Sequence, residues 1–202
     1  MKSSATLGAV VLAAALIGAP AQAVPAKPAA TAPTAAARSS AWVVDKAASR
    51  LGFKSSFGGE SFEGAFRAWD ASIQFDPKAL AGGKVVVSVQ PGSVASGDET
   101  RDEALPGGDW FNVAKFPRAT FTSTGFKPLG PGRYQVDGTL TLRGVTKPIS
   151  MPVAITVTST QARATGSVVL NRSQFGVGQG QFKSAESIPF NVLVSFTVVA
   201  HH

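Results

Sequence analysis

The stretch "IPFNVLVSFTV", residues 188–198, carries apolar side chains with a period of two. Every even position is apolar: Ile188, Phe190, Val192, Val194, Phe196 and Val198. Successive side chains of a β-strand point to opposite faces, so this period predicts a strand with one strongly apolar face.

The same period recurs in other parts of the chain. These stretches are residues 51–57, 85–89, 134–142, 149–157 and 164–170. Glycine-rich turn signals such as Gly58-Gly59 and Gly130-Pro131-Gly132 separate them, and the short gaps favour antiparallel neighbours. With about eight strands and no long amphipathic helix, the chain is predicted to be all-β, as an antiparallel barrel or a sandwich.

One predicted strand changes the parity of its apolar face. Phe62 and Phe66 fall on even positions, whereas Ile73 and Phe75 fall on odd ones. We therefore expect a β-bulge within residues 67–70. A bulge increases the local bend and twist, which helps a sheet to close on itself.

The first 40 residues differ in composition from the rest. Residues 1–23 combine a basic start, an apolar run and an Ala-Gln-Ala site, which predicts a secretory signal peptide. Residues 24–40 are rich in Pro and Ala without periodicity, and we interpret them as a disordered spacer. No other stretch reaches the roughly 18 apolar residues of a transmembrane helix. We expect a soluble periplasmic domain at residues 41–200 with no integral membrane segment.

Missing residue types exclude several chemistries. The chain has no cysteine, and its two histidines, His201 and His202, stand at its end, which we interpret as outside the patterned strands. A Ser-His-Asp triad, a cysteine nucleophile and a His-ligated zinc site are then ruled out. We expect a protein that is not an enzyme and that has no metal and no cofactor.

The charged residues give two further indications. Removing Lys2, Lys27 and Arg38 from the count leaves 16 basic against 12 acidic residues in the domain, a net charge of +4. The basic residues are scattered, so nucleic-acid binding is not expected. The acidic cluster within residues 98–103 is interpreted as a solvated capping face, with carboxylate chemistry as the alternative.

The irregular segment from Ser96 to Val113 interrupts the strands. Asp98 is predicted to cap a short helix that runs through Leu105. In a barrel, the longer stretch from Thr100 to Ser123 would plug one end with Trp110, Phe111 and Phe116. Arg101 and Asp102 would either tie the plug to the rim through an ion pair or contact the head group of a ligand.

Several ordered motifs resemble those of one known family. These are "SVASGDETRDEALPGGDWFNVAKFPRATFTST" (residues 93–124), "YQVDGTLTLRGVTKPISMPV" (134–153) and "NRSQFGVG" (171–178). With Trp42-Val43-Val44-Asp45 at its start, the chain resembles the YceI-like family of exported, lipocalin-like polyisoprenoid-binding proteins. One departure is Pro106-Gly107-Gly108, where the family commonly has a charged or polar residue after the leucine.

The resemblance implies an eight-stranded antiparallel barrel that holds an isoprenoid or fatty-acyl chain, with the polar head near its mouth. The residues expected to contact this ligand are Phe53, Phe66, Arg101, Asp102, Trp110, Phe111, Phe121, Arg172 and Phe175. Period-two alternation alone does not separate a hollow barrel from a filled one. Small residues at inward positions, namely Ser55, Gly64, Gly138, Ala164 and Gly166, indicate internal space.

Three functions therefore remain open at this point. The first is a periplasmic lipid-binding protein that transports, stores or protects its ligand. The second is a carboxylate- and Arg-dependent enzyme acting on a bound lipid or stress metabolite. The third is a filled barrel that binds a protein partner. The oligomeric state, including a homodimer, is left open as well.

Overall fold

The structure is a computed structural model that describes residues 41–202, so the predicted signal peptide and spacer lie outside the described residues. Strand and helix bounds are, in chain order, β1 (Ala41–Phe57), β2 (Glu60–Phe66), β3 (Trp69–Gln74), β4 (Lys84–Val89), β5 (Val94–Ala95), α1 (Glu99–Ala104), β6 (Ala119–Gly130), β7 (Arg133–Leu142), β8 (Val145–Val157), β9 (Gln161–Asn171) and β10 (Asn191–His201). Short 3₁₀ turns lie at Leu80–Gly82, Pro91–Ser93, Arg172–Phe175 and Gly180–Phe182.

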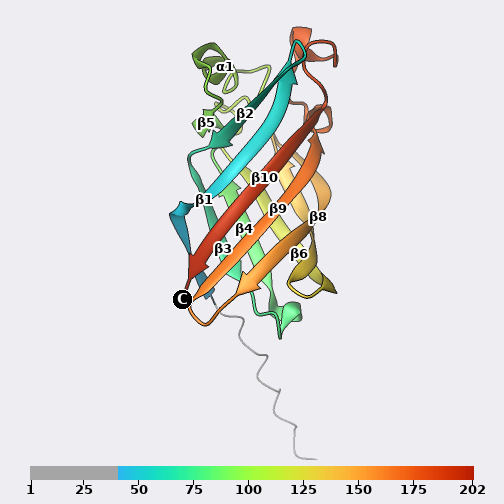
Figure 1. Ribbon diagram of the computed structural model, residues 1–202. Coiled ribbons are helices and arrows are strands. Elements are labelled where there is room, and N and C mark those ends of the chain that lie inside the picture. The colour runs from blue at the N-terminus through green and yellow to red at the C-terminus, as the bar shows by residue number, and fades with distance from the viewer. Residues whose placement is uncertain (1–40) are drawn as a thin grey trace, which may run out of the picture. The chain divides into compact units, whose positions relative to one another are not determined.

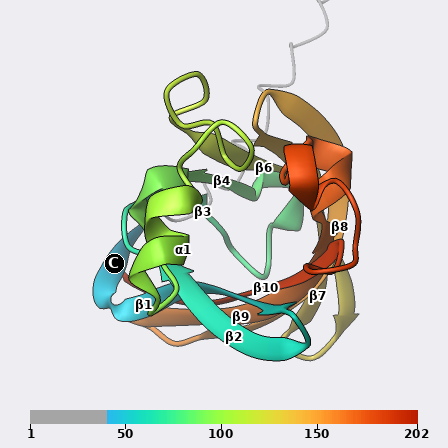
Figure 2. The same ribbon diagram turned by 90° about the horizontal axis from the view of Figure 1, so that it is seen from above.

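The strands form one closed antiparallel sheet (Figures 1 and 2). The ring runs β1, β10, β9, β8, β7, β6, β4, β3 and back to β1, which makes eight strand positions. β2 continues the line of β3 beside the other half of β1, and β5 pairs with β2. The prediction of an eight-stranded antiparallel barrel is confirmed, and the sandwich is wrong because β10 pairs with β1.

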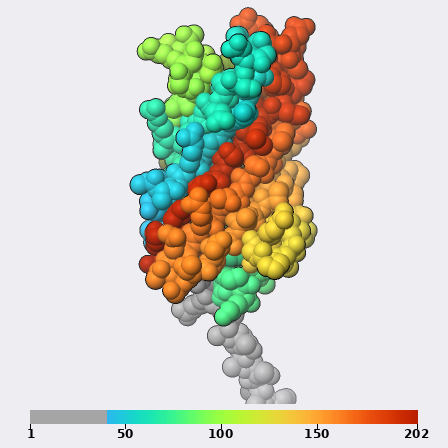
Figure 3. Space-filling view, in the orientation of Figure 1, coloured from blue at the N-terminus to red at the C-terminus, as the bar shows by residue number. Residues whose placement is uncertain are grey.

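The stretch 188–198, from which the first strand was predicted, leads into β10, which lies at the closure of the ring. β10 pairs along its length with β9, from Asn191 opposite Asn171 to His201 opposite Gln161. Its other edge pairs with β1, where Phe53 lies opposite Val194. On the near face, side chains of β1, β10 and β9 form diagonal bands in contact with one another (Figure 3). Closure leaves this strand no free edge.

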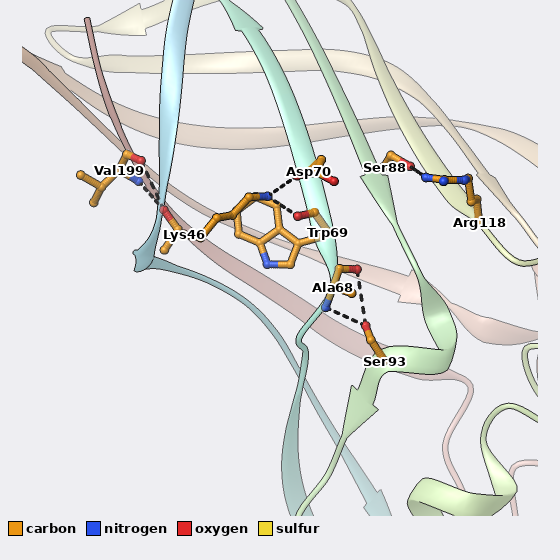
Figure 4. Close-up of polar contacts among 9 residues, drawn as sticks. Lys46, Ala68, Trp69, Asp70, Ser88, Ser93, Arg118 and Val199 are labelled. Atoms are coloured by element: carbon orange, nitrogen blue, oxygen red, sulfur yellow. Dashed lines mark hydrogen bonds and ion pairs between the residues drawn. The ribbon is translucent and has the colours of Figure 1, made fainter.

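The predicted parity change occurs at the expected place but in another form. The chain leaves β2 at Phe66 and starts β3 at Trp69, and the two strands pair with different parts of β1. This is a break between strands and not a bulge within one. Ser93 occupies the break: its backbone oxygen accepts from Arg67 N, and its hydroxyl accepts from Ala68 N (Figure 4). The backbone groups at the interruption are thereby satisfied.

β1 carries an irregularity of its own at this position. Its register against β10 shifts between Asp45 and Arg50. Lys46 reaches across to β3, where its ammonium group bonds the Trp69 carbonyl, lies 3.0 Å from the Asp70 carboxylate and sits 4.0 Å from the centre of the Trp69 ring (Figure 4). Side-chain contacts therefore join β1 and β3 where their backbone ladder is interrupted.

The two histidines belong to the fold, which corrects the expectation that they lie outside the strands. His201 is the last residue of β10 and lies opposite both Val43 and Gln161. The ring centre of His202 lies 3.7 Å from that of Trp42. The sequence pattern missed them because it follows apolar residues, whereas the backbone ladder continues past the last apolar position.

Two differently built ends close the barrel. At the closed end, near the C-terminus in Figure 1, Trp42, Phe75, Tyr134 and Ala200 form a buried cluster. At the opposite loop end lie α1 and the segments 105–118 and 172–190, on the side of the ring that faces the viewer in Figure 2. Among residues 41–202, no helix has the length and apolar character needed to cross a membrane.

Candidate functional site

A cavity of about 740 Å³ occupies the interior of the barrel. Alternate residues of the strands line it, including Val192, Val194, Phe196 and Val198 of the stretch that first indicated a strand. Its volume lies within the range of about 300–1,000 Å³ that is typical of small-molecule sites. A barrel filled by its own side chains is therefore excluded for this chain.

The lining is almost entirely hydrocarbon. Among residues 41–202, the charged residues that line it are Arg50, Asp98, Arg101 and Arg172, and the hydroxyl groups belong to Ser55 and Thr100. Many lining valines and phenylalanines are only partly buried although they point inward, since the cavity itself leaves them accessible. Such a surface favours burial of an apolar ligand over binding of a polar one.

Three phenyl rings lie against glycines of neighbouring strands. A Cβ on Gly138 would lie 2.5 Å from Phe121 Cζ, and one on Gly166 would lie 2.6 Å from Phe196 Cζ. A Cβ on Gly64 would overlap the ring of Phe53. The sequence suggested that these glycines leave empty space. In the structure, phenyl rings occupy the positions that side chains at the glycines would take. The glycines let the rings lie along the wall and not across the axis, and that arrangement keeps the cavity open.

The helix at the loop end forms as predicted. The Asp98 carboxylate accepts a hydrogen bond from Arg101 N at 2.8 Å, so Asp98 caps α1. Leu105 and Trp110, which follow the helix, are buried with Phe175 and Val177. These residues join the segment after α1 to the segment 172–190 in one apolar cluster.

Phe116 does not belong to this plug, which corrects the prediction. It packs on the β7–β8 turn, where a Cβ on Gly144 would lie 2.7 Å from its ring. The turn residues Arg143 and Gly144 have φ angles of 50° and 76°. Both central residues of a tight type I′ hairpin turn need positive φ, and only glycine adopts it without a steric cost. Trp110 and Phe111 do line the cavity.

Arg101 and Asp102 have different surroundings. The Arg101 guanidinium lines the cavity, stacks 3.8 Å above the Phe62 ring and lies 4.0 Å from the Asp98 carboxylate. Asp102 does not line the cavity. Its Oδ1 accepts hydrogen bonds from the Ser96 hydroxyl at 2.6 Å and the Ser96 backbone N–H at 2.7 Å. These bonds tie α1 to the segment after β5, and the Ser96 hydroxyl is the main cause of a lowered Asp102 pKa.

Arg172 is buried at the loop end with 5% of its surface exposed. Its guanidinium donates to the carbonyl oxygens of Val177, Ser184, Ile188 and Pro189 at 2.8–3.1 Å. Burial lowers the pKa of Arg172. The side chain both fixes the fold of segment 172–190 and faces the cavity.

Eight of the nine residues expected to contact ligand line this cavity, and Asp102 is the exception. The sequence reasoning missed Arg143, whose guanidinium donates to Gly176 O at 2.6 Å and Gly108 O at 2.5 Å. The sequence reasoning also treated Ser55 only as a small inward residue and gave its hydroxyl no role. Ser55 lines the cavity, and its Oγ is buried without a hydrogen-bond partner among residues 41–202. The alternation of residues 51–57 already indicated that Ser55 points inward. No sequence pattern indicated the contacts of Arg143.

Fold and cavity define a class: a closed, lipocalin-like antiparallel β-barrel with an apolar cavity of ligand size. The family model described as the YceI-like domain matches residues 42–200. The chain belongs to the YceI-like family, as the resemblance of its motifs indicated.

Curated relatives agree with this assignment. A UPF0312 protein of Azotobacter vinelandii is 37% identical over 147 residues, which cover 71% of this chain and 69% of that protein. A UPF0312 protein of Yersinia pestis is 46% identical over 93 residues, covering 46% of this chain and 48% of the other. The chain thus spans about half the length of the Yersinia relatives it matches.

Solved structures show the same fold. BcnA of Burkholderia cenocepacia is 32% identical with a TM-score of 0.75, covering 78% of this chain and 99% of BcnA. The YCEI protein of Campylobacter jejuni is 27% identical with a TM-score of 0.63, covering 69% and 84%. A polyisoprenoid binding domain from Saccharophagus degradans, implicated in plant cell wall breakdown, has a TM-score of 0.65 over 79% and 97%. At 18% identity, this last likeness shows the fold alone.

Proposed function

We propose that the protein binds an isoprenoid or fatty-acyl amphiphile inside the barrel and transports, stores or protects it in the periplasm. The observation that supports this proposal most directly is the apolar cavity of about 740 Å³. The domain from Saccharophagus degradans is described as polyisoprenoid binding, which agrees with the proposal at the level of the fold.

Hydrophobic burial is large enough to drive such binding. Each methylene group removed from water contributes about 0.8 kcal/mol. A chain of about fifteen carbons would contribute on the order of 10 kcal/mol before the entropic costs of association are subtracted. Apolar contact therefore supplies affinity, and the few polar lining groups orient the ligand.

The proposal includes no chemistry by the protein itself. The alternative enzyme would need a carboxylate at the ligand, and Asp102 is turned to Ser96 and does not line the cavity. Asp98, the carboxylate that does line it, caps α1. No group of three or more potential metal-binding side chains is found among residues 41–202.

Native mass spectrometry of protein isolated from its own host tests the binding proposal. We expect an apolar ligand of defined mass to remain bound. A protein without such a ligand that also fails to bind added palmitic acid, hexadecanol or farnesol would contradict the proposal.

Cell fractionation and the N-terminal sequence of the isolated protein test the periplasmic location, and size-exclusion chromatography tests the homodimer.

A further inference from the structure

The guanidinium of Arg172 carries a positive charge that no described residue neutralises. All four hydrogen-bond acceptors of Arg172 are neutral backbone carbonyls. Among residues 41–202, no carboxylate forms an ion pair with it. Its other close neighbours are the rings of Phe190 and Trp110, with centres 5.2 and 5.8 Å from Arg172 Cζ. Carbonyl dipoles stabilise the positive charge, but they carry no net charge and therefore do not neutralise it.

The rest of the cavity lining does not supply the missing anion. Three of its four charged residues are arginines, and the fourth is Asp98. The Asp98 carboxylate accepts from Arg101 N, and its other oxygen lies 4.0 Å from the Arg101 guanidinium. Arg101 is therefore the counter-ion of the Asp98 carboxylate. The formal charge of the lining is +2 in an otherwise hydrocarbon surface.

An uncompensated cation at the wall of an apolar cavity favours one class of ligand. The effective dielectric constant next to an apolar wall is lower than that of water. A guanidinium therefore attracts a nearby anion more strongly there than in solution. Four of the five N–H donors of Arg172 bond backbone carbonyls, so a carboxylate or phosphate would be held by the positive charge and by the one remaining N–H. The lowered Arg172 pKa shows that burial disfavours this charge, and a bound anion would offset that cost.

Ser55 provides a second polar group in the same cavity. Ser55 lines the cavity, but its hydroxyl oxygen is buried against protein atoms and has no hydrogen-bond partner among the described residues. Ser55 lies opposite Phe62 in the β1–β2 ladder, and the Arg101 guanidinium stacks on the ring of Phe62. An unpartnered buried hydroxyl is costly, and rotation about χ1 of Ser55 would turn it to the cavity, where a ligand atom would satisfy it.

We propose that the cavity selects amphiphiles with an anionic head, a carboxylate or a phosphate, over neutral amphiphiles with the same chain, and that Arg172 is the main determinant of this selection. Arg101 and Ser55 contribute the remaining polar contacts. The inference rests on the proposed lipid-binding function and narrows its ligand class.

Matched ligand pairs test the inference on the unmodified protein. Dodecanoate and dodecyl phosphate are compared with dodecanol, and farnesyl phosphate is compared with farnesol, by displacement of the neutral fluorophore N-phenyl-1-naphthylamine. We expect each anion to bind at least tenfold more tightly than its neutral partner, about 1.4 kcal/mol. Equal affinities would overturn the inference and leave lipid binding intact. Failure of all five compounds to bind would instead contradict the proposed function.

The two anion types resolve the head group further. A preference for dodecanoate over dodecyl phosphate indicates a fatty-acid ligand. The reverse preference indicates a lipid phosphate. Either result upholds the selection of an anion.

Arg143 offers a matched control for Arg172. Both side chains donate to carbonyls of the loop end, but Arg143 does not line the cavity. We expect R172Q to reduce the ratio of anionic to neutral affinity to near one, and R143Q to retain it. An unchanged ratio in a folded R172Q protein would overturn the role of Arg172.

R172Q removes four loop hydrogen bonds, so circular dichroism must show that the variant folds. If it does not fold, the ligand ratio of the unmodified protein decides the inference alone. S55A removes a hydroxyl that has no partner, and we expect its fold to be unchanged. Loss of one ligand hydrogen bond should weaken anion binding about fivefold. An S55A protein with unaltered affinity would remove Ser55 from the site.

Discussion

The two ends of the barrel are closed by different kinds of interaction. At the closed end, the rings of Phe75 and Tyr134 meet edge to face with centres 5.3 Å apart, and Trp42 Nε1 donates to the Phe75 carbonyl at 2.9 Å. At the loop end, Arg143 and Arg172 donate to backbone carbonyls of segments that are not strands. Strand backbones cannot separate without breaking the sheet, whereas loops held by hydrogen bonds can open locally.

This difference assigns separate roles to the two ends. The closed end contributes apolar burial and therefore global stability. The loop end holds three of the four charged residues that line the cavity, namely Asp98, Arg101 and Arg172. We expect a ligand to pass through the loop end, because opening it leaves the barrel ladder intact.

The largest expected effect concerns the closed end. Phe75 has 3% of its surface exposed, and F75A should lower the free energy of unfolding by about 3–5 kcal/mol. Chemical denaturation measures the loss. V43A, at an apolar residue with 72% exposure, is the control and should change stability little. Equal effects of both substitutions would contradict the stabilising role of apolar burial at the closed end.

A narrower cavity is the next expected effect. G64A places a methyl group where the Phe53 ring lies, so the ring must turn toward the axis. We expect a loss of about 1–3 kcal/mol in stability and weaker binding of long chains. The second substitution in G64A/F53L removes the ring and should restore binding. G125A is the matched control, since a Cβ there meets nothing within 4 Å. If G64A bound ligand normally, the phenyl rings would not control the cavity width.

Loosening the loop end should have a smaller and local effect. R143Q removes one part-buried and one exposed hydrogen bond, to Gly176 and Gly108, so it should lower the free energy of unfolding by only about 1 kcal/mol. Hydrogen exchange should become faster at the amides of Gly178 and Gln179, which donate to Asp109 O, and stay unchanged in β9 and β10. Uniformly faster exchange would contradict a separable loop end.

The smallest expected effect is a dependence on pH outside both ends. Lys127, then Gln135 and Ser150, lower the pKa of Asp137 on the outer wall from 3.8 to about 2. A lowered folded-state pKa stabilises the protein above the unfolded value, and this stabilisation is lost as the pH falls from 3.8 through about 2. D137N should therefore flatten the decrease of the melting temperature over this range. An identical decrease in both proteins would show that these contacts do not persist in solution.

Local sequence patterns were sufficient for the wall of the barrel. The inward residues of β4, β7, β8, β9 and β10 follow from alternation, because side-chain direction along a strand is a local property. β6 was harder to anticipate. Its register against β7 shifts between Ser123 and Gly125, so Phe121 and Phe126 both face the cavity although their parity differs. No repeat of period two spans such a bulge.

The candidate site was predicted less completely. The resemblance to a family placed aromatic residues and two arginines at the cavity. It did not separate Arg101, which faces the interior, from Asp102, which binds Ser96. Adjacent residues of a helix point in directions about 100° apart, so their partners depend on how the helix docks. The role of Arg143 depends on carbonyls from two distant segments, which no sequence window contains.

The order of residues along the chain was enough to specify strands, turns, the capped helix and an interior face made of hydrocarbon. It could not specify whether that interior is open, because a phenyl ring is compatible with lying along a wall or across an axis. The contacts of Phe53, Phe121 and Phe196 with glycines on neighbouring strands decide this point. Which residues meet across a ladder depends on the register of the two strands, and only closure of the sheet brings all inward residues around one interior. The cavity and the unpaired charge at its loop end therefore exist only in the tertiary structure.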